Sequence, residues 1–276
     1  MELEQLRNAK RLVQKWMAAR LHRRVEQQRT LSVPWTVFSL VPPNRWQRFS
    51  DALFVPREVA AARILSADHP LSVLLTEGDL SNAAAVTPLT ILEIWRLLMT
   101  LRPRSILELG CGVSTPIFAY YAQSVERGGG EKPRVYSIEH SAEWIDIVRR
   151  RLETEGLASY ITSIAAPLKH VEIAGHSIDC YDQDAVAGRI PAGSVDFCLI
   201  DGPPAVQQPL NRLGCLPLVT PYLIERATVL LDNTAREGER RVIAQWRQSY
   251  PGRLLRLNGL FSSSGMASFV WNPAKS

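Results

Sequence analysis

The chain has 276 residues, of which 46% are hydrophobic and 21% are charged, as is usual for a globular protein. No apolar run approaches the ~20 residues that a membrane-spanning helix requires. The first thirty residues carry eight Lys or Arg and three Asp or Glu without an uninterrupted apolar core, so they are not typical of a cleavable secretory signal. A cytoplasmic protein is therefore expected.

The positive charge lies at the start of the chain. The formal net charge is +5, and the first thirty residues contribute 8 − 3 = +5, so residues 31–276 are neutral overall. A neutral body gives no support to nucleic-acid binding. The cysteines lie far apart and lack metal-ligand spacing, which favours reduced, mostly buried thiols over a zinc site or disulfides. They are Cys111, Cys180, Cys198 and Cys215.

Residues 1–86 are interpreted as an extension in front of the main domain. Between Glu2 and Gln28 there is no Gly or Pro, and apolar residues recur at helical spacing, which predicts an amphipathic helix of ~40 Å. Residues 1–30 could contact an anionic membrane surface or a partner, which would make the protein membrane-peripheral. The alternatives are packing on its own domain or in a homodimer. An irregular stretch and a short helix from about Arg57 to Leu65 follow.

The stretch from Arg104 to Pro116 has the pattern of a buried strand, a glycine turn and a helix start. Gly110 and Gly112 let the backbone turn sharply and let a ligand approach closely, because neither residue has a Cβ. Ser114 or Thr115 is expected to cap the next helix. Such a turn is typical of a site for a nucleotide-like ligand.

Strand and helix patterns alternate along the main domain, residues 87–276, which ends in two strands joined by a short turn. Alternation predicts a parallel sheet with helices on both faces, and the short turn requires an antiparallel final pair. The expected fold is α/β, a doubly wound, mostly parallel seven-stranded Rossmann-like sheet ending in an antiparallel hairpin, with an N-terminal helical extension. Helices are expected at Thr87–Leu101, Pro116–Arg127, Ala142–Glu155, within Leu213–Glu225 and at Arg236–Ser249, and strands at Arg134–Glu139, Tyr160–Ala165, Ser194–Asp201, Ala227–Asp232, Arg253–Asn258 and Met266–Trp271; Ser177–Tyr181 is read as a short strand or a loop.

The glycine turn lacks the third glycine of a dinucleotide-binding turn, because Thr115 stands in that position. The run Glu108-x-Gly110-x-Gly112 instead resembles the first motif of class I S-adenosylmethionine-dependent methyltransferases. The resemblance implies that the acid and the turn face the methionine part of the cofactor. It also implies that Glu139, which ends the second strand, binds the ribose hydroxyls. The residues expected to bind S-adenosylmethionine are Glu108, Gly110, Cys111, Gly112, Ser114, Glu139, His140 and Ala166.

The residues at the end of the third predicted strand are apolar. Ala165 and Ala166 would lie near the adenine, where many members of that family place a polar side chain. The Ala-Pro-Leu run there, followed by Cys180-Tyr181-Asp182, resembles a bacterial branch of the family. Three single histidines are interpreted as solvated groups on surface turns rather than as catalytic residues. They are His140, His170 and His176.

Two more acidic groups follow the fourth and fifth strands. Asp201 closes one strand, and Asp232 with Asn233 closes the next, which gives a hard-oxygen set suited to Mg²⁺. This order resembles the metal-dependent O-methyltransferases that act on catechol-like hydroxyls. In the alternative, Asp201 is a lone general base or an acid that positions the cofactor, and Asp232 with Asn233 caps the following helix. The Gly-Pro-Pro after Asp201 matches better the bacterial methyltransferases that resemble residues 87–271.

The first hypothesis is therefore an S-adenosylmethionine-dependent methyltransferase, acting on oxygen of a small molecule or glycan precursor, with Asp201 as the catalytic residue. Arg212 and Arg236 could hold an anionic acceptor, or could be solvated helix residues. The second hypothesis is a non-catalytic cofactor-binding or scaffold protein that uses its N-terminal helix as an interface. The third is an NAD-dependent oxidoreductase.

Overall fold

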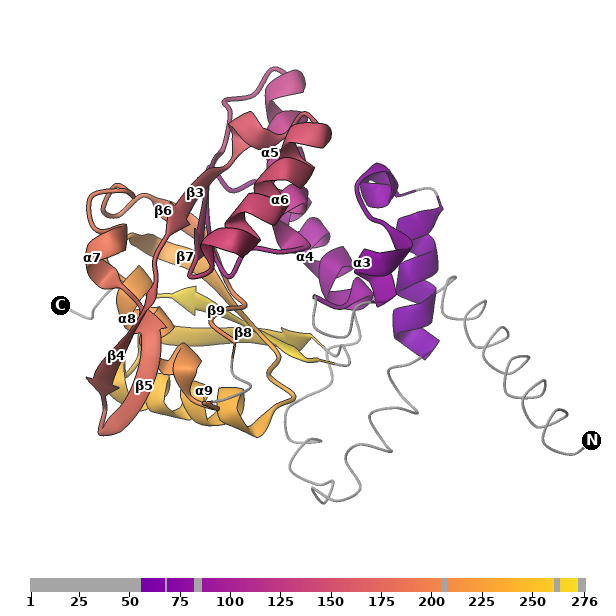
Figure 1. Cartoon of the computed structure of the whole chain (residues 1–276). Coiled ribbons are helices and arrows are strands. Elements are labelled where there is room, and N and C mark those ends of the chain that lie inside the picture. The colour runs from indigo at the N-terminus through magenta and orange to yellow at the C-terminus, as the bar shows by residue number, and fades with distance from the viewer. Residues whose placement is uncertain (1–55, 68, 82–85, 205–207, 261–263, 273–276) are drawn as a thin grey trace, which may run out of the picture. The chain divides into compact units, whose positions relative to one another are not determined.

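The computed structural model describes residues 56–67, 69–81, 86–204, 208–260 and 264–272 (Figure 1). The helix expected over Glu2–Gln28 and the irregular stretch after it lie outside the described residues, so both stay predictions. The chain divides into two compact units, Met1–Glu93 with Gly259–Ser263, and Ile94–Asn258 with Ser264–Ser276. The domain boundary expected between residues 86 and 87 also stays a prediction.

The described part of the first unit is helical. Residues 56–66 form a helix, which is followed by the 3₁₀ turn η2 (Pro70–Val73), by α3 (Glu77–Ser81) and by the start of α4 (Pro88–Leu101). The backbone N–H of Leu89 donates to the Glu58 carboxylate at 2.9 Å, so an acid from the first helix satisfies a free donor at the start of α4. Both longer helices lie where the sequence predicts them.

The second unit is built on a seven-stranded sheet in the order β3-β2-β1-β6-β7-β9-β8 (Figure 1). The first five strands in this order are parallel, and β9 runs antiparallel to β7. All five residues of β1 are buried, as expected for a central strand covered on both faces. The predicted fold is thus confirmed. The strands are β1 (Ser105–Leu109), β2 (Arg134–Glu139), β3 (Thr162–Ala165), β6 (Val195–Ile200), β7 (Leu223–Asp232), β8 (Leu254–Leu260) and β9 (Met266–Trp271).

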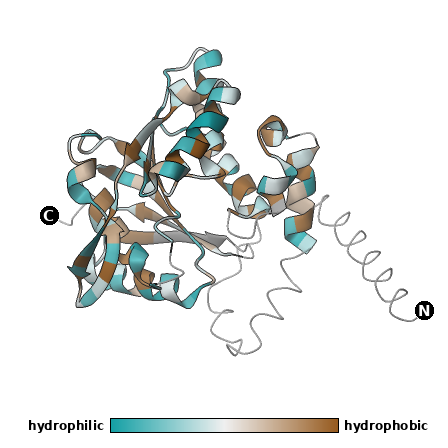
Figure 2. Cartoon of the chain, viewed as in Figure 1, coloured by the Kyte–Doolittle hydropathy of each residue, from teal (hydrophilic) through white to brown (hydrophobic). Residues whose placement is uncertain are grey.

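Helices pack around this sheet, and Figure 2 shows that they carry both polar and apolar residues. In the last helix Val242, Ile243 and Trp246 are buried, which is the apolar side that the sequence pattern indicates. Ser141 accepts a hydrogen bond from the backbone N–H of Trp144 at 3.1 Å and so caps its helix as predicted. The helices are α5 (Ser114–Arg127), α6 (Ala142–Thr154), α7 (Gln183–Val186), α8 (Cys215–Val219) and α9 (Glu237–Ser249), with 3₁₀ turns η3 (Ala158–Tyr160) and η4 (Asn211–Gly214).

The helix expected within Leu213–Glu225 is found there as α8, which ends at Val219 because the pairing of Leu223 with Val195 places the following residues in β7. One detail of the predicted helices is wrong. The cap of α5 is Val113, which makes no side-chain capping bond. The hydroxyl side chains expected to cap that helix bind a buried carboxylate instead, as described below.

A separate two-stranded ribbon follows β3. It pairs β4 (Leu168–Ile173) antiparallel with β5 (His176–Tyr181), so the segment read as a strand or a loop is a strand. Ala174 and Gly175 join the two strands with positive φ angles of 51° and 75°, as in the tight two-residue turns of hairpins. Because β4 has only weak alternation, the sequence does not indicate it. Ile178 and Tyr181 of the ribbon belong to the hydrophobic core, and Cys180 is also buried.

None of the helices in the described part of the chain combines the length and the apolar character needed to cross a bilayer. Three of the four cysteines are buried thiols, as expected, and Cys111 is partly exposed. The strand order reverses beside β1, since the chain builds β2 and β3 on one side of it and β6 and β7 on the other. In open parallel sheets ligands bind at this kind of switch point, beyond the carboxyl ends of the strands.

Candidate active site

The ends of β1 and β6 meet through two glycines. Gly110 has a φ of +91°, and a Cβ built on it would lie 2.8 Å from the backbone nitrogen of Gly202. A Cβ on Gly202 would lie 2.1 Å from the Tyr181 hydroxyl and 2.9 Å from the Gly110 Cα. Neither position therefore has space for a side chain. The predicted glycine turn is packed backbone to backbone against the segment that follows Asp201.

Glu108 lies fully buried beneath the turn. Its carboxylate accepts hydrogen bonds from the hydroxyls of Ser114, of Thr115 at 2.7 Å and of Ser137 at 2.8 Å. Burial raises the pKa of Glu108 to about 7, although the three hydroxyl donors act in the opposite direction. Within the described structure, Ser114 thus donates to Glu108 on the buried side of the glycine turn, and this contact stabilises the turn.

The burial of Glu108 predicts a pH-dependent cost. The pKa of Glu108 rises from its ordinary value of 4.5 to about 7 in the folded chain. The folded state is therefore more stable at low pH, where Glu108 is protonated, and it loses this stability as the pH rises from about 4.5 to about 7. Relative to Glu108→Gln, the unfolding free energy of the wild type should fall by roughly 3 kcal/mol between pH 4 and pH 8, from about 1.4 kcal/mol per pKa unit. Urea unfolding of both proteins at several pH values measures this difference. A difference that does not change with pH would contradict the assignment.

Glu139 ends β2 and is 4% exposed. Its carboxylate accepts hydrogen bonds from the backbone N–H groups of Cys111 at 3.3 Å and of His140 and Ser141 at 2.9 Å each. The Nδ1 atom of His140 lies 2.6 Å from the same carboxylate. The acid therefore ties the end of β2 to the glycine turn.

The structure brings most of the predicted cofactor residues together. The backbone N–H of Ala166 donates to the Glu139 carbonyl at 2.9 Å, and the Ala166 side chain is buried. Gly112 lies in the turn, where a Cβ would meet nothing within 4 Å. The sequence analysis interprets His140 as a solvated side chain, and this interpretation is wrong. Its ring also lies edge-on to Tyr181, with the ring centroids 6.3 Å apart.

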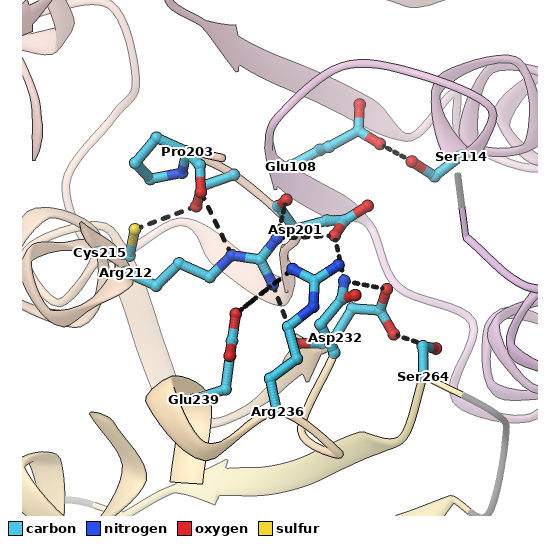
Figure 3. A network of polar contacts seen from close by, with 12 residues as sticks. Glu108, Ser114, Asp201, Pro203, Arg212, Cys215, Asp232, Arg236, Glu239 and Ser264 are labelled. Atoms are coloured by element: carbon cyan, nitrogen blue, oxygen red, sulfur yellow. Dashed lines mark hydrogen bonds and ion pairs between the residues drawn. The ribbon is translucent and has the colours of Figure 1, made fainter. Parts of the chain in front are cut away.

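Asp201, which follows β6, and Asp232, which ends β7, also come together (Figure 3). The Asn233 amide nitrogen donates to Asp201 at 3.1 Å and to Asp232 at 2.8 Å, and Asp232 also accepts from the Ser264 hydroxyl at 3.2 Å. Asn233 has a φ of +64°, in the left-handed region that Asn adopts more readily than most other residues. These residues do not cap α9, whose N-cap is Arg236. The interpretation of Asp232 and Asn233 as helix caps is therefore wrong.

Arg212 occupies the centre of this network (Figure 3). It is 3% exposed, and its guanidinium donates to the backbone carbonyls of Asp201, of Asp232 at 2.9 Å and of Pro203 at 3.4 Å. It also donates to the Asp201 carboxylate at 3.0 Å. Both sequence interpretations of Arg212, a substrate ligand and a solvated helix residue, are thus wrong. It binds the ends of β6 and β7 together.

The neighbouring groups are buried acids and one accessible arginine. Glu239 is 1% exposed and lies 3.8 Å from Arg212 and 3.7 Å from Arg236. Sequence reasoning missed Glu239 because it reads as an ordinary first-turn acid of a helix. The Arg236 side chain is 48% exposed, so it remains able to meet a ligand.

Burial dominates the electrostatics of the two aspartates. It raises the pKa of Asp232 to about 8, together with repulsion from Asp201, while Arg212 opposes the shift. The pKa of Asp201 is raised by burial as well, and Arg212 acts against this rise. The side chain of Asp201 is 18% exposed. Asp201 is thus a carboxylate with some access to solvent, set in a fixed hydrogen-bond frame.

His170 lies apart from this site, on the ribbon and not on a turn. Its ring nitrogens lie 3.0 Å from the Asp179 carboxylate and 2.6 Å from the Ser177 hydroxyl. The order of groups is that of a serine hydrolase, yet the His170 side chain is 62% exposed. Because β4 pairs His170 with Asp179 directly across the ribbon, we interpret these bonds as cross-strand contacts. His176 begins β5 and is partly buried.

Comparison with known proteins gives one family. Residues 107–234 match the family model described as “Methyltransferase domain”. A search of curated proteins gave no match.

Several solved structures share the fold. A putative caffeoyl-CoA O-methyltransferase from Staphylococcus aureus is 15% identical with a TM-score of 0.53, over 79% of this chain and 100% of that one. A putative O-methyltransferase from Klebsiella pneumoniae is 16% identical with a TM-score of 0.51, over 87% and 95% of the two chains. An O-methyltransferase from Bacillus cereus in complex with SAH is 17% identical with a TM-score of 0.49, over 82% and 96%. The first two likenesses show the shared fold.

Proposed function

We propose that this chain, a class I S-adenosylmethionine-dependent methyltransferase, transfers the methyl group to a hydroxyl oxygen of a small-molecule or glycan-precursor acceptor. The observation that carries the proposal is the position of Asp201, a partly exposed carboxylate one strand away from the glycine turn at the switch point. The methyltransferase match supports methyl transfer over hydride transfer with NAD. The two structures with the higher TM-scores above are named putative O-methyltransferases, which makes oxygen the first acceptor atom to test.

The cofactor would lie across the ends of β1 and β2. Gly110, Cys111 and Gly112 would present their backbone to it, and Glu139 would accept hydrogen bonds from its ribose hydroxyls. A carboxylate oxygen can accept more than one hydrogen bond, so the backbone donors on Glu139 leave capacity for this role. Glu108 and Ser114 would act from below by holding the turn. His140 and Ala166 would border the adenosine.

Substitutions of the two glycines should have different effects, one on cofactor affinity and the other on the stability of the fold. Gly112→Ala should fold normally, because its Cβ meets no protein atom within 4 Å, but should weaken binding of S-adenosylhomocysteine at least tenfold by occupying the approach to the turn. Gly110→Ala should instead destabilise the fold, since its Cβ would lie 2.8 Å from the Gly202 nitrogen. Thermal unfolding and calorimetric titration of the two variants separate the effects. Wild-type affinity in Gly112→Ala would argue against a close approach of the cofactor.

Asp201 would act on the acceptor. S-adenosylmethionine, when bound, supplies an electrophilic methyl group. That methyl group would be transferred to the acceptor oxygen with S-adenosylhomocysteine as the leaving group, and Asp201 would take the hydroxyl proton. Because burial raises its pKa, Asp201 is a stronger base than a solvated aspartate. Arg236, at the edge of the network, is positioned to pair with an anionic group of the acceptor.

The donor set partly fits Mg²⁺. Asp201, Asp232 and Asn233 gather as predicted, and the Asn233 carbonyl would face the carboxylates after a 180° rotation of its amide. Among the described residues, no three His, Cys, Asp or Glu side chains form a metal-binding group, so the amide would be the third ligand. When bound there, Mg²⁺ would lower the pKa of an acceptor hydroxyl.

Metal use stays a prediction with a direct test. If the three residues bind Mg²⁺, turnover should fall at least tenfold after chelation and return when Mg²⁺ is added, and Asn233→Ala should lose this response. Turnover that is unchanged by chelator would remove the metal from the proposal and leave Asp201 as the base.

The experiment that tests the function is a cofactor titration followed by a methyl-transfer screen over hydroxylated acceptors, with amines as the comparison. Binding of S-adenosylhomocysteine in preference to NADH, with methyl transfer to a hydroxyl, is the expected result. Preference for NADH would contradict the proposal. Cofactor binding without transfer to any acceptor would favour the scaffold hypothesis, in which the N-terminal helix forms a membrane, partner or homodimer interface.

A further inference from the structure

Trp144 is an exposed aromatic side chain beside the proposed cofactor site. It is 43% exposed, and it is the one aromatic residue among the large apolar side chains that the described residues leave exposed. Its indole N–H donates to the Cys111 carbonyl at 2.7 Å. One end of the ring is therefore fixed to the glycine turn, while a large part of the ring remains accessible.

The attachment of Trp144 links three parts of the site. The backbone of Cys111 donates to Glu139 through its N–H and accepts from Trp144 through its carbonyl. Trp144 itself lies in the first turn of α6, where Ser141 accepts from its backbone N–H. The indole is thus held between the glycine turn and the helix that follows the proposed ribose ligand, with little freedom to rotate away.

The two alanines at the nearby strand end have no side chain that can hydrogen-bond a purine. Ala165 ends β3 and Ala166 follows it, and Ala166 is fully buried. An aromatic face can replace such contacts, because base–aromatic stacking stabilises a bound base without hydrogen bonds. We propose that the exposed face of Trp144 stacks on the purine ring of the cofactor. This inference rests on the proposed function.

The position of Trp144 favours the purine over an aromatic acceptor. Trp144 follows β2, next to the proposed ribose ligand Glu139, whereas Asp201 follows β6. Because β2 and β6 lie on opposite sides of β1, the indole is on the adenosine side of the site. An aromatic acceptor would have to cross the glycine turn to reach it.

Trp144→Ala should weaken binding of both S-adenosylhomocysteine and 5′-methylthioadenosine by the same factor, about 5- to 150-fold for one stacked base. Trp144→Leu should lose most of the affinity, whereas Trp144→Phe, which keeps an aromatic ring but loses the bond to Cys111, should remain within a few-fold of wild type. Ile147→Ala is the matched control, since it lies one turn further on α6 and is 44% exposed. It should bind both ligands normally.

The outcomes distinguish this inference from the proposed function. If the wild type binds neither ligand, the proposed function fails. If the wild type binds both and Trp144→Ala binds them equally well, the stacking proposal is overturned. Loss of affinity for S-adenosylhomocysteine alone would place the indole at the methionine half, and a raised KM for the acceptor alone would place it at the acceptor; both results contradict the proposal. Circular dichroism confirms that each variant is folded.

Discussion

Asp201→Asn is expected to lower kcat/KM for methyl transfer by about 10²- to 10⁴-fold, the usual contribution of a positioned general base. The amide keeps the size of the carboxylate, and its oxygen can still accept from Arg212, which now bonds to Asp201 at 3.0 Å. Affinity for S-adenosylhomocysteine should therefore stay within about threefold of wild type, well under the tenfold that 1.4 kcal/mol represents. Steady-state kinetics and calorimetric titration of the same preparation measure the two effects.

The same strand supplies a matched control. Asp196 lies near the start of β6 and accepts from the backbone N–H groups of Arg104 at 2.9 Å and Ser105 at 3.0 Å. Asp196→Asn should leave kcat/KM unchanged, because this carboxylate serves the opposite end of the sheet. Equal losses in both variants would show that Asp201 acts through stability, and full activity in Asp201→Asn would remove its catalytic role.

Arg212→Met is expected to lower the unfolding free energy by about 3–5 kcal/mol, the usual cost of removing one partner of a buried ion pair. The loss would leave buried carboxylates and the carbonyls of Asp201 and Asp232 without their guanidinium donor. Urea unfolding measures the change. If the variant does not accumulate as folded protein, Arg212→Lys should show an intermediate loss, because an ammonium keeps the charge but lacks the planar set of donors.

Arg236→Met is the control for this prediction. Its side chain is 48% exposed, so the unfolding free energy should change by no more than about 0.5 kcal/mol, as for most surface substitutions. Its expected effect is a raised KM for an anionic acceptor. The opposite pattern, a stable Arg212→Met with a raised KM, would restore Arg212 as a substrate ligand.

The two arginines show where sequence reasoning stops. Arg212 and Arg236 each come after a predicted strand that ends at an aspartate. The sequence pattern therefore predicts the same two alternatives for both, a ligand of an anionic acceptor or a solvated helix residue. Only the packing of η4 against the ends of β6 and β7 buries Arg212, and this depends on contacts between residues far apart in the chain. The fold could be predicted from the sequence, because buried parallel strands and amphipathic helices each have a local residue pattern.

The glycine turn illustrates a similar limit. Its strand, its turn and the following helix could be predicted from Arg104 to Pro116, whereas the direction of the Ser114 and Thr115 side chains could not. A hydroxyl next to a helix start usually caps it, but a fully buried carboxylate needs hydrogen-bond donors more than the helix end does. β4 was missed for a related reason, since its identity comes from pairing with β5 rather than from its own sequence.

The contact between Gly110 and Gly202 sets how this site can change during evolution. With no side chain between the two backbones, the spacing between the glycine turn and Asp201 is fixed by main-chain contact alone. Substitutions elsewhere in the core cannot widen or narrow it without separating β1 from β6. If Asp201 is the base that we propose, its distance from the glycine turn is therefore set by the scaffold. New acceptors must be accommodated by residues outside this contact, such as Arg236 at its margin.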